Sequence, residues 1–379
     1  METTTIDCAS CGEPAPSDAT WCEACGHELS LAPKPACVSC GEREVDPDEG
    51  YCLSCGYRQP RERDHLVIGD GPLVAISDRG KRHHHNEDAA ALGTVGPDAD
   101  ADALGEGQAG ALVLVVCDGV SSTPGSAEAS AVASVAARDH LVAGLSGGAD
   151  SNDADGSDEQ EPAAEVANGE IDVAALLVGA VAAAQDRAAG APEPDIAPVA
   201  DGPPSSTLVA VVVRPLSVGA SIQGAAESGD GSDRMRYELS TAWVGDSRAY
   251  WVSEDDAVAL SGPDHELDGS LVRWLGADSV DPTPDIDVRT VSEPGHLVVC
   301  TDGLWRYAAS PAELASLVRR LTSEGQTGMS LAEAMVDHAN EGGGHDNITV
   351  ALWSNRPDWP TDVSTNPSIA SAAATDPER

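Results

Sequence analysis

The sequence contains no phenylalanine, and aromatic residues make up only 3% of it. Positive charge is also scarce, because 21 lysine and arginine residues stand against 64 aspartate and glutamate residues, for a formal net charge of −43. Nucleic acid and anionic membrane surfaces repel a chain this acidic, so we expect neither as a partner. The scarcity of lysine beside abundant alanine and aspartate indicates a bacterium with GC-rich DNA.

Long apolar runs are missing as well. A membrane-spanning helix needs about 18 to 20 consecutive apolar residues, whereas the longest candidate run, Ala174–Ala184, fits a buried helix. The first ten residues carry neither the basic segment nor the apolar segment of a secretory signal. We therefore expect a cytoplasmic protein, in which the ten cysteines stay reduced and serve metal binding or core packing.

Eight of the ten cysteines lie in the first 60 residues, in a pattern that occurs twice. Each copy has two CxxC pairs, and glycine follows every pair. Zinc takes four thiolates in a tetrahedron, and one CxxC turn supplies two of them. Redox chemistry is the alternative for such a pair, but no βαβ pattern of the thioredoxin type lies nearby. The pattern resembles a double zinc ribbon and predicts two structural zinc sites, formed by Cys8, Cys11, Cys22 and Cys25 and by Cys37, Cys40, Cys52 and Cys55.

Composition divides the rest of the chain. After the zinc module at residues 1–60, we expect a linker at 61–71, a catalytic body at 72–353 and a disordered tail at 354–379. An insertion at about 146–170 carries eight acids and no base, which predicts disorder. Apolar strands alternate with helical stretches in the body, which indicates an α+β fold. We expect strands at 73–77, 111–116, 206–213, 238–245 and 296–301, and helices at 126–145, 171–189, 311–322 and 330–340.

Carboxylates lie beside several of the apolar runs. Asp118 and Asp302 each follow such a run and precede a glycine, Asp346 precedes the final strand, and Glu87 and Asp88 precede another. Carboxylates from distant parts of the chain, all at strand ends, predict one cluster. Mg²⁺ and Mn²⁺ prefer oxygen ligands of this kind. The sequence therefore indicates metal-assisted hydrolysis.

Seven motifs follow one another in an order that resembles the PPM family of metal-dependent serine/threonine protein phosphatases, also called type 2C. The resemblance implies a four-layer αββα sandwich of two antiparallel sheets flanked by helices, here preceded by two small zinc ribbons. It also implies two Mn²⁺ or Mg²⁺ ions in a cleft between the sheet edges. The motifs are NED at 86–88, VCDG at 116–119, SST at 205–207, WVGDSRAY at 243–250, LVRWLGA at 271–277, CTDGLW at 300–305 and HDNITV at 345–350.

The resemblance assigns a role to each ligand. Asp118 would bridge both metal ions, and Asp302 and Asp346 would hold one of them. Glu87 and the backbone carbonyl of Gly119 would hold the other. A water shared by two such ions has a lowered pKa and can attack phosphorus in line while the metals offset the charge.

Further positions either match the family or depart from it. Asp88 would orient the metal-bound water, and Asp246 matches the position of a weaker third metal ion in several members. Family members usually carry a phosphate-binding arginine where this chain has His83. Either Arg82 or a protonated His83 would bind the phosphate in its place, or the run of three histidines is only a solvated loop. Val120 cannot serve as a proton donor, so the general acid stays unassigned.

We therefore predict a phosphatase that acts on phosphoserine and phosphothreonine in proteins. It would oppose a serine/threonine kinase, and its substrates would include that kinase or the kinase's targets. The zinc ribbons would dock protein partners. The alternative is a catalytically weak or inactive scaffold that binds phosphoproteins, which His83 and Val120 favour. A ribbon-led nucleic-acid binder is disfavoured by the charge.

Overall fold

The computed structural model describes residues 5–8, 10–16, 21–26, 29, 36–46, 50–96, 110–147, 171–191, 202–216, 235–254, 256–262, 264 and 270–355. The chain divides into two compact units, Met1–Arg61 and Glu62–Arg379. Most of the predicted acidic insertion, from residue 148 on, and the predicted tail, from residue 356 on, lie outside the described residues.

The first unit contains little regular structure. Strands β1 (Thr5–Asp7) and β2 (Pro14–Pro16) pair antiparallel. Among its described residues, the buried apolar cluster consists of Cys8, Cys22 and Leu29 alone. A unit this small cannot be held together by such a core, so its fold depends on what the cysteines bind.

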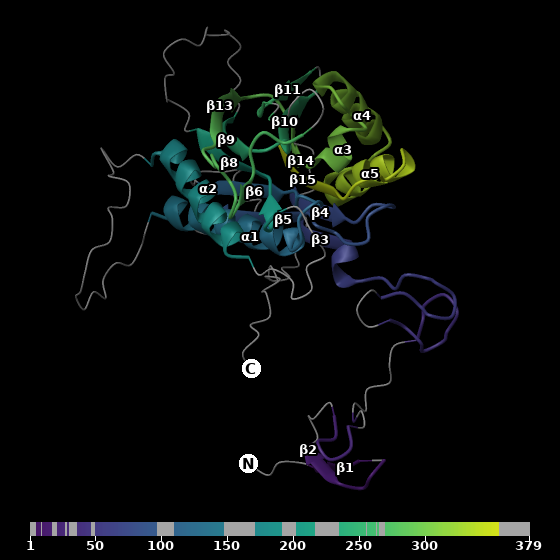
Figure 1. Cartoon of the computed structure of the whole chain (residues 1–379). Helices are drawn as coiled ribbons and strands as arrows, with labels where there is room; N and C mark the ends of the chain where they lie inside the picture. Colours follow the sequence, from purple (N-terminus) through teal and green to yellow (C-terminus); the bar gives the residue numbers. More distant parts are fainter. Residues whose placement is uncertain are drawn as a thin grey trace, which may run out of the picture. The chain divides into compact units, whose positions relative to one another are not determined.

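The second unit contains two large antiparallel sheets (Figure 1). The five-stranded sheet has the order β13 (Asp285–Val291), β9 (Arg236–Val244), β8 (Leu208–Leu216), β6 (Ala111–Cys117) and β5 (Ala89–Val95). The six-stranded sheet has the order β11 (Ala257–Ala259), β10 (Arg248–Ser253), β14 (Gly295–Cys300), β15 (Ile348–Asn355), β4 (Leu73–Asp78) and β3 (His65–Asp70). A short pair, β7 (Ser205–Ser206) and β12 (Leu275–Gly276), lies beside them.

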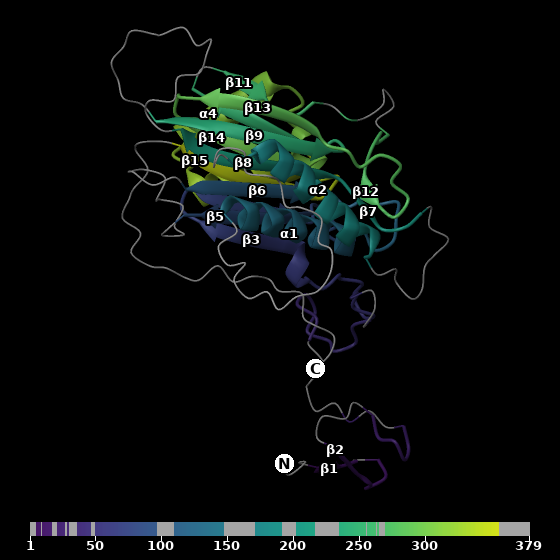
Figure 2. The same cartoon turned by 90° about the vertical axis from the view of Figure 1, so that its left-hand side faces the viewer.

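Helices cover the outer face of each sheet. Helices α1 (Ser126–Leu145) and α2 (Val173–Ala189) share a buried core with the five-stranded sheet, and both lie across its face in Figure 2. Helices α4 (Pro311–Ser323) and α5 (Gly328–Glu341) pack on the six-stranded sheet. A third core fills the space between the sheets. These layers confirm the predicted αββα sandwich.

The sequence dictates these layers through burial on both faces of the central strands. All seven residues of β6, ALVLVVC, are buried, because one face meets the other sheet and the opposite face meets α1. Helix α1 buries small residues at helical spacing, among them Ala129, Ala133 and Ala137, which lets its axis approach the sheet closely. Its bounds agree with the predicted helix at 126–145.

Two predicted boundaries were wrong. Residues 65–70, assigned to the linker, form the edge strand β3, whose Leu66 and Ile68 are half-buried while their neighbours are exposed. An edge strand with only two inward-facing apolar residues shows a weak alternation of apolar and polar residues in the sequence. The linker therefore reduces to the short helix η1 (Glu62–Asp64) and its neighbours. Strand β15 also continues to Asn355, past the predicted start of the tail at 354.

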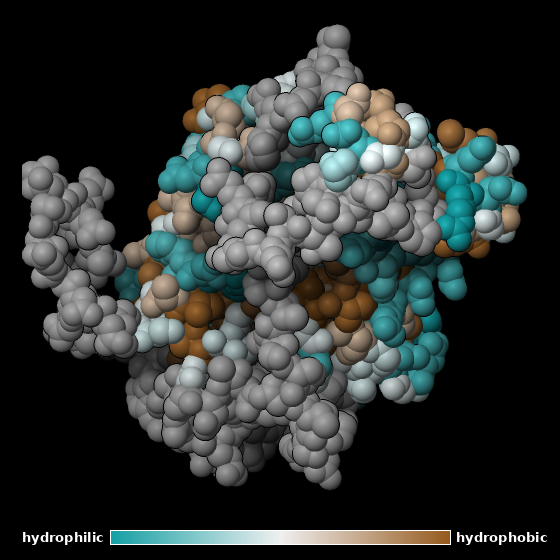
Figure 3. Space-filling model, turned by 90° about the horizontal axis from the view of Figure 1, so that it is seen from below, coloured by the Kyte–Doolittle hydropathy of each residue, from teal (hydrophilic) through white to brown (hydrophobic). Residues whose placement is uncertain are grey.

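The described surface is mixed in character. Large hydrophobic side chains that are exposed on the second unit are distributed over different elements, such as Val67 on β3, Val135 on α1 and Val178 on α2. Figure 3 shows hydrophobic patches interrupted by hydrophilic ones on the face it presents. Within the described residues, every helix is too short or too polar to cross a membrane.

Candidate functional site

The two sets of four cysteines predicted from the sequence each converge on one point. In the first set the Sγ atoms of Cys8 and Cys25 are 3.7 Å apart and those of Cys11 and Cys22 are 3.6 Å apart. The second set repeats these distances, 3.7 Å and 3.6 Å. Zinc–sulfur bonds of about 2.3 Å place the corners of a tetrahedron about 3.8 Å apart. Both sets therefore fit a structural Zn²⁺ ion, and the sulfur atoms are too far apart for disulfides.

Backbone groups favour the thiolate form at one cysteine of each set, Cys8 and Cys37. Burial would raise the pKa of Cys8, but hydrogen bonds from the backbone N–H groups of Cys11 and Ser10 lower it to about 6. The same arrangement lowers the pKa of Cys37 to about 6. Each knuckle closes on a glycine in the left-handed conformation, as at Gly12 and Gly41, where φ is 76° and 81°. A thiolate is the form that zinc binds.

Strand register brings the predicted carboxylates to one edge of the sandwich. Ala89 of β5 is paired with Cys117 of β6, so Asp88 and Asp118 leave their strands at the same edge. Cys300 of β14 is paired with Val350 of β15, which does the same for Asp302 and Asp346. Asp246 lies in the turn between β9 and β10 at this edge. The short helix α3 (Asp302–Trp305) begins at Asp302.

Burial and mutual repulsion raise the pKa values of three of these carboxylates, Asp88, Asp118 and Asp302. Burial, followed by the charges of Asp88, Asp302, Asp246 and Asp346, raises the pKa of Asp118 well above its ordinary value. Burial likewise raises the pKa of Asp88 to about 7, and burial together with Asp346 raises that of Asp302 to about 8. A cluster of this kind favours a proton or a cation.

Two buried oxygens of the cluster have no hydrogen-bond partner, Oδ1 of Asp88 and Oδ1 of Asp302. Buried carboxylate oxygens are normally satisfied, so each such atom calls for an explanation. Several hard oxygen donors, two of them unsatisfied, are the donor set that Mg²⁺ and Mn²⁺ take. The residues present therefore fit divalent cations.

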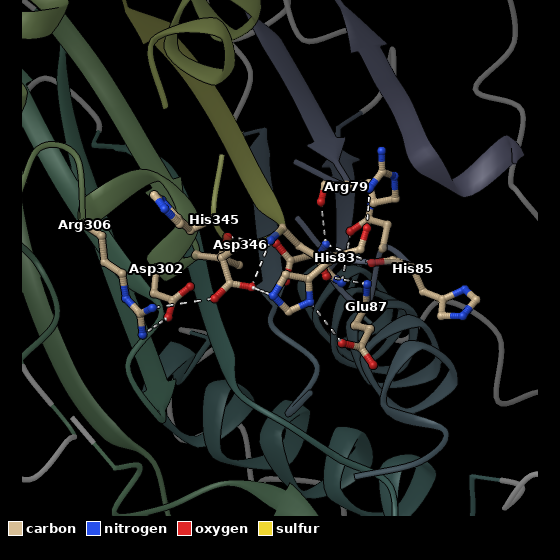
Figure 4. A network of polar contacts seen from close by, with 12 residues as sticks. Arg79, His83, His85, Glu87, Asp302, Arg306, His345 and Asp346 are labelled. Atoms are coloured by element: carbon tan, nitrogen blue, oxygen red, sulfur yellow. Dashed lines mark hydrogen bonds and ion pairs between the residues drawn. The ribbon is translucent and has the colours of Figure 1, made fainter. Parts of the chain in front are cut away.

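Two basic side chains lie among the carboxylates (Figure 4). Nε2 of His83 is 3.1 Å from Asp346, and Nδ1 is 3.8 Å from Glu87. From the other side, the guanidinium of Arg306 is 2.6 Å from Asp302 and 3.6 Å from Asp346. Among the described residues, only the cysteine sets bring three or more ligand atoms within 4.8 Å of one another. The carboxylates are more widely spaced, with these basic side chains between them.

The loop that carries Glu87 is fixed by residues that the sequence analysis did not single out. The side chain of Asn347, 2% exposed, accepts a hydrogen bond from the Glu87 backbone N–H (2.8 Å) and donates to the carbonyls of Arg79 and His85 (2.9 Å each). Ser126 donates to the Glu87 carboxylate at 2.7 Å. Burial acts to raise the pKa of Glu87, but hydrogen bonds from His83 and from serines outweigh it and lower the pKa.

Asp118 and Asp88 are held in the same way. The carbonyl of Asp118 accepts from the Ser206 hydroxyl (3.0 Å) and the Thr207 N–H (2.8 Å), which explains the SST motif. The carboxylate of Asp88 accepts from the Thr301 hydroxyl at 2.9 Å. A Cβ at Gly119 would lie 2.5 Å from the carbonyl oxygen of Glu87, so only glycine lets the backbone come this close.

The remaining sequence candidates lie around the cluster. Arg82 is exposed, and its side chain forms no ion pair with the described residues. Asp246 is buried, and its carbonyl accepts from the indole of Trp305 at 3.0 Å, which ties the turn to α3. Cys117 and Cys300 are fully buried in strands, and burial raises the pKa of Cys300 to about 12, so both serve core packing.

Comparisons with known proteins agree with this arrangement. The double zinc ribbon family model matches residues 8–56, and the protein phosphatase 2C family model matches residues 93–337. No curated protein matches the chain.

Among solved structures, the chain is similar to the serine/threonine phosphatase of S. agalactiae, at 19% identity over 77% of this chain and 100% of that one, with a TM-score of 0.48. It is also similar to Stp1 of Staphylococcus aureus (15% identity, 79% and 99% coverage, TM-score 0.47). A third is the catalytic domain of the phosphatase PstP, solved with two manganese ions (20% identity, 76% and 98% coverage, TM-score 0.46).

The phosphatase 2C match spans well over half of the 379 residues and includes Asp118, Asp246 and Asp302. Glu87, Asp88 and Asp346 lie outside the matched span, but the strands that carry them belong to the same two sheets. The chain belongs to the protein phosphatase 2C family.

Proposed function

We propose that the protein hydrolyses phosphoserine and phosphothreonine in proteins, and that it depends on two Mn²⁺ or Mg²⁺ ions. Glu87, Asp118, Asp302 and Asp346, with the backbone carbonyl of Gly119, would hold the ions, and Asp246 would contribute to a weaker third site. The observation that carries the proposal is the convergence of strand-end carboxylates at one edge, where the pKa values of Asp88, Asp118 and Asp302 are raised. Among the described residues of the cluster, one buried oxygen of Asp88 and one of Asp302 lack a partner.

When bound, the divalent cations supply Lewis acidity, which lowers the pKa of water and offsets phosphate charge. The chain's own residues orient the reactants. Asp88 is fixed by Thr301 through one oxygen, and its other oxygen is left without a partner. That second oxygen is suited to accept a hydrogen bond from the attacking water and so to orient it.

The phosphate needs a cationic ligand, and three side chains are candidates. Both ring nitrogens of His83 face carboxylates, and Arg82 is exposed and forms no ion pair with the described residues. Arg306 approaches Asp302 and Asp346 from the side opposite His83 while 52% of its side chain stays exposed (Figure 4). A planar guanidinium binds phosphate through two donors at once. We infer that Arg306 is the principal phosphate ligand, with His83 and Arg82 in lesser roles.

The zinc-binding unit would dock the phosphoprotein substrate, including a serine/threonine kinase or its targets, in the cytoplasm. Val38 and Leu53 occupy the second position of two CxxC turns and are 65% and 68% exposed. Apolar side chains at a knuckle tip suit contact with a protein surface. Replacing both with serine should lower turnover of a phosphoprotein and leave turnover of a short phosphopeptide unchanged.

Turnover tests the main proposal. Zinc-loaded protein is assayed on p-nitrophenyl phosphate and a phosphothreonine peptide with Mn²⁺, with Mg²⁺ or with neither, and zinc content is measured in each sample. We expect metal-dependent turnover that falls about 100-fold or more in Asp118→Asn. Asp70→Asn, which changes an exposed carboxylate at the end of β3, is the matched control and should behave as wild type.

The second candidate function is a phosphoprotein-binding scaffold without turnover. It is favoured by the engagement of His83 with carboxylates at the position where phosphate binding was expected. Folded, zinc-loaded protein that binds a phosphothreonine peptide with Mn²⁺ present, yet does not hydrolyse it, would support the scaffold and overturn the enzyme.

A further inference from the structure

The helix η1 is the first element of the second unit, and it contacts the metal-binding loop directly. The backbone carbonyl of Arg63 accepts a hydrogen bond from the Asn86 side chain at 2.9 Å. The Arg63 guanidinium donates to the backbone carbonyl of Asp88 at 3.2 Å. One residue thus holds both ends of the Asn86–Asp88 motif, from a position two residues after the boundary at Arg61.

The next residue of η1 holds the beginning of the same loop. The carbonyl of Asp64 accepts from the Arg79 backbone N–H at 2.8 Å, and its carboxylate is 3.7 Å from the Arg79 guanidinium. Arg79 in turn donates to the carbonyl of His83. Residues 79–88 are therefore fastened to η1 at three separate places.

Charge adds to these contacts. Burial lowers the pKa of Arg63, while Glu128, Asp88 and Glu87 act on it in the opposite direction. An arginine stays charged through such a shift. Arg63 is thus a fixed cation behind the two acids of the loop, on a segment that joins the zinc-binding unit to the catalytic unit.

We propose that Arg63 is a positioning residue for the Glu87–Asp88 pair, and that its contacts with the loop contribute to the divalent-metal affinity of the catalytic site. The proposal rests on the proposed function, because it takes Glu87 as a metal ligand. Hydrogen-bonded partners that orient a metal ligand typically contribute 10- to 100-fold in metal affinity.

Calorimetric titration of Mn²⁺ into zinc-loaded, full-length protein tests the role of Arg63. Arg63→Ala should weaken Mn²⁺ binding roughly 10- to 100-fold, and Arg63→Lys should restore part of it, because lysine keeps a donor for the Asp88 carbonyl. The matched control is Arg289→Ala on β13, whose guanidinium pairs with Asp287. A purely structural role would lower the free energy of unfolding of both Arg63 variants and leave Mn²⁺ affinity within twofold of wild type, which would overturn the proposal. Wild-type turnover reports separately on the proposed function.

Discussion

Replacing Asn347 with alanine removes one buried amide that holds three backbone groups of the candidate site. The Glu87 N–H and the carbonyls of Arg79 and His85 would each lose the hydrogen bond to this amide. A buried polar group left unsatisfied costs about 1–3 kcal/mol. Water will reach some of them, so we expect Asn347→Ala to lower the free energy of unfolding by about 3–5 kcal/mol, a large part of the ~5–15 kcal/mol typical of domains.

Function should fall for a separate reason. Without Asn347 the Glu87 backbone is no longer fixed against β15, so the Glu87 carboxylate spends less time in the geometry that a metal ion needs. Mn²⁺ affinity should drop by about 10- to 100-fold. Asn347→Asp keeps the acceptor for the Glu87 N–H but loses both donors and adds a charge beside Asp346, so it should be at least as damaging.

Urea unfolding followed by tryptophan fluorescence gives the free energy, and calorimetry gives the Mn²⁺ affinity. Asn355→Ala is the matched control, because Asn355 is the same residue type at the other end of the same strand. A loss below about 1 kcal/mol, with unchanged Mn²⁺ affinity in Asn347→Ala, would refute the view that this amide organises the site.

Three further predictions follow from burial, metal dependence and steric contact. The pKa values of Asp88 and Asp302 in the folded protein are about 7 and about 8, against an ordinary 3.8. Between the ordinary pKa and these raised values, the folded state therefore binds more protons than the unfolded state. The free energy of unfolding of the Mn²⁺-free protein should therefore fall as pH rises from about 4 to about 8, and constant stability in urea titrations across that window would contradict the assignment. Cys37→Ser should release one of two zinc ions by metal analysis yet leave the melting temperature of the catalytic unit unchanged, because that unit has its own cores. Gly303→Ala would place a Cβ 1.9 Å from the backbone carbonyl oxygen of Asn347, which directly precedes β15, and should lower the free energy of unfolding in urea by about 1–3 kcal/mol or more. Gly96→Ala, with no contact nearer than 3.5 Å, should not.

The sequence predicted the layers because the central strands and the helices carry strong local patterns. Helix α1 repeats small and apolar residues every three or four positions and has the predicted bounds. Strand β3 was missed because only Leu66 and Ile68 face the sheet, and an alternation of two residues is not distinctive. The disposition of strand-end acids was also predictable, since antiparallel pairing places the ends of neighbouring strands at one edge.

The supports of the site were not predictable from local patterns. Asn347 contacts a backbone group 260 residues away, and nothing in its own segment marks that contact. Arg306 is different, because it lies four residues after Asp302 and such a pair meets on one turn of helix. This spacing alone would have placed Arg306 beside the carboxylate cluster, although Arg306 was not among the predicted site residues.

The arrangement of charges explains how a chain of net charge −43 folds around a carboxylate cluster before any divalent cation binds. His83 and Arg306 both pair with Asp346 at the rim, while burial raises the pKa values of Asp88 and Asp302 and favours the protonated form of each. A divalent cation must displace those protons and weaken those pairs. Metal affinity should therefore rise with pH as protons are lost. Once the Arg306 guanidinium is released from Asp302, it is available at the rim to bind an incoming phosphate dianion.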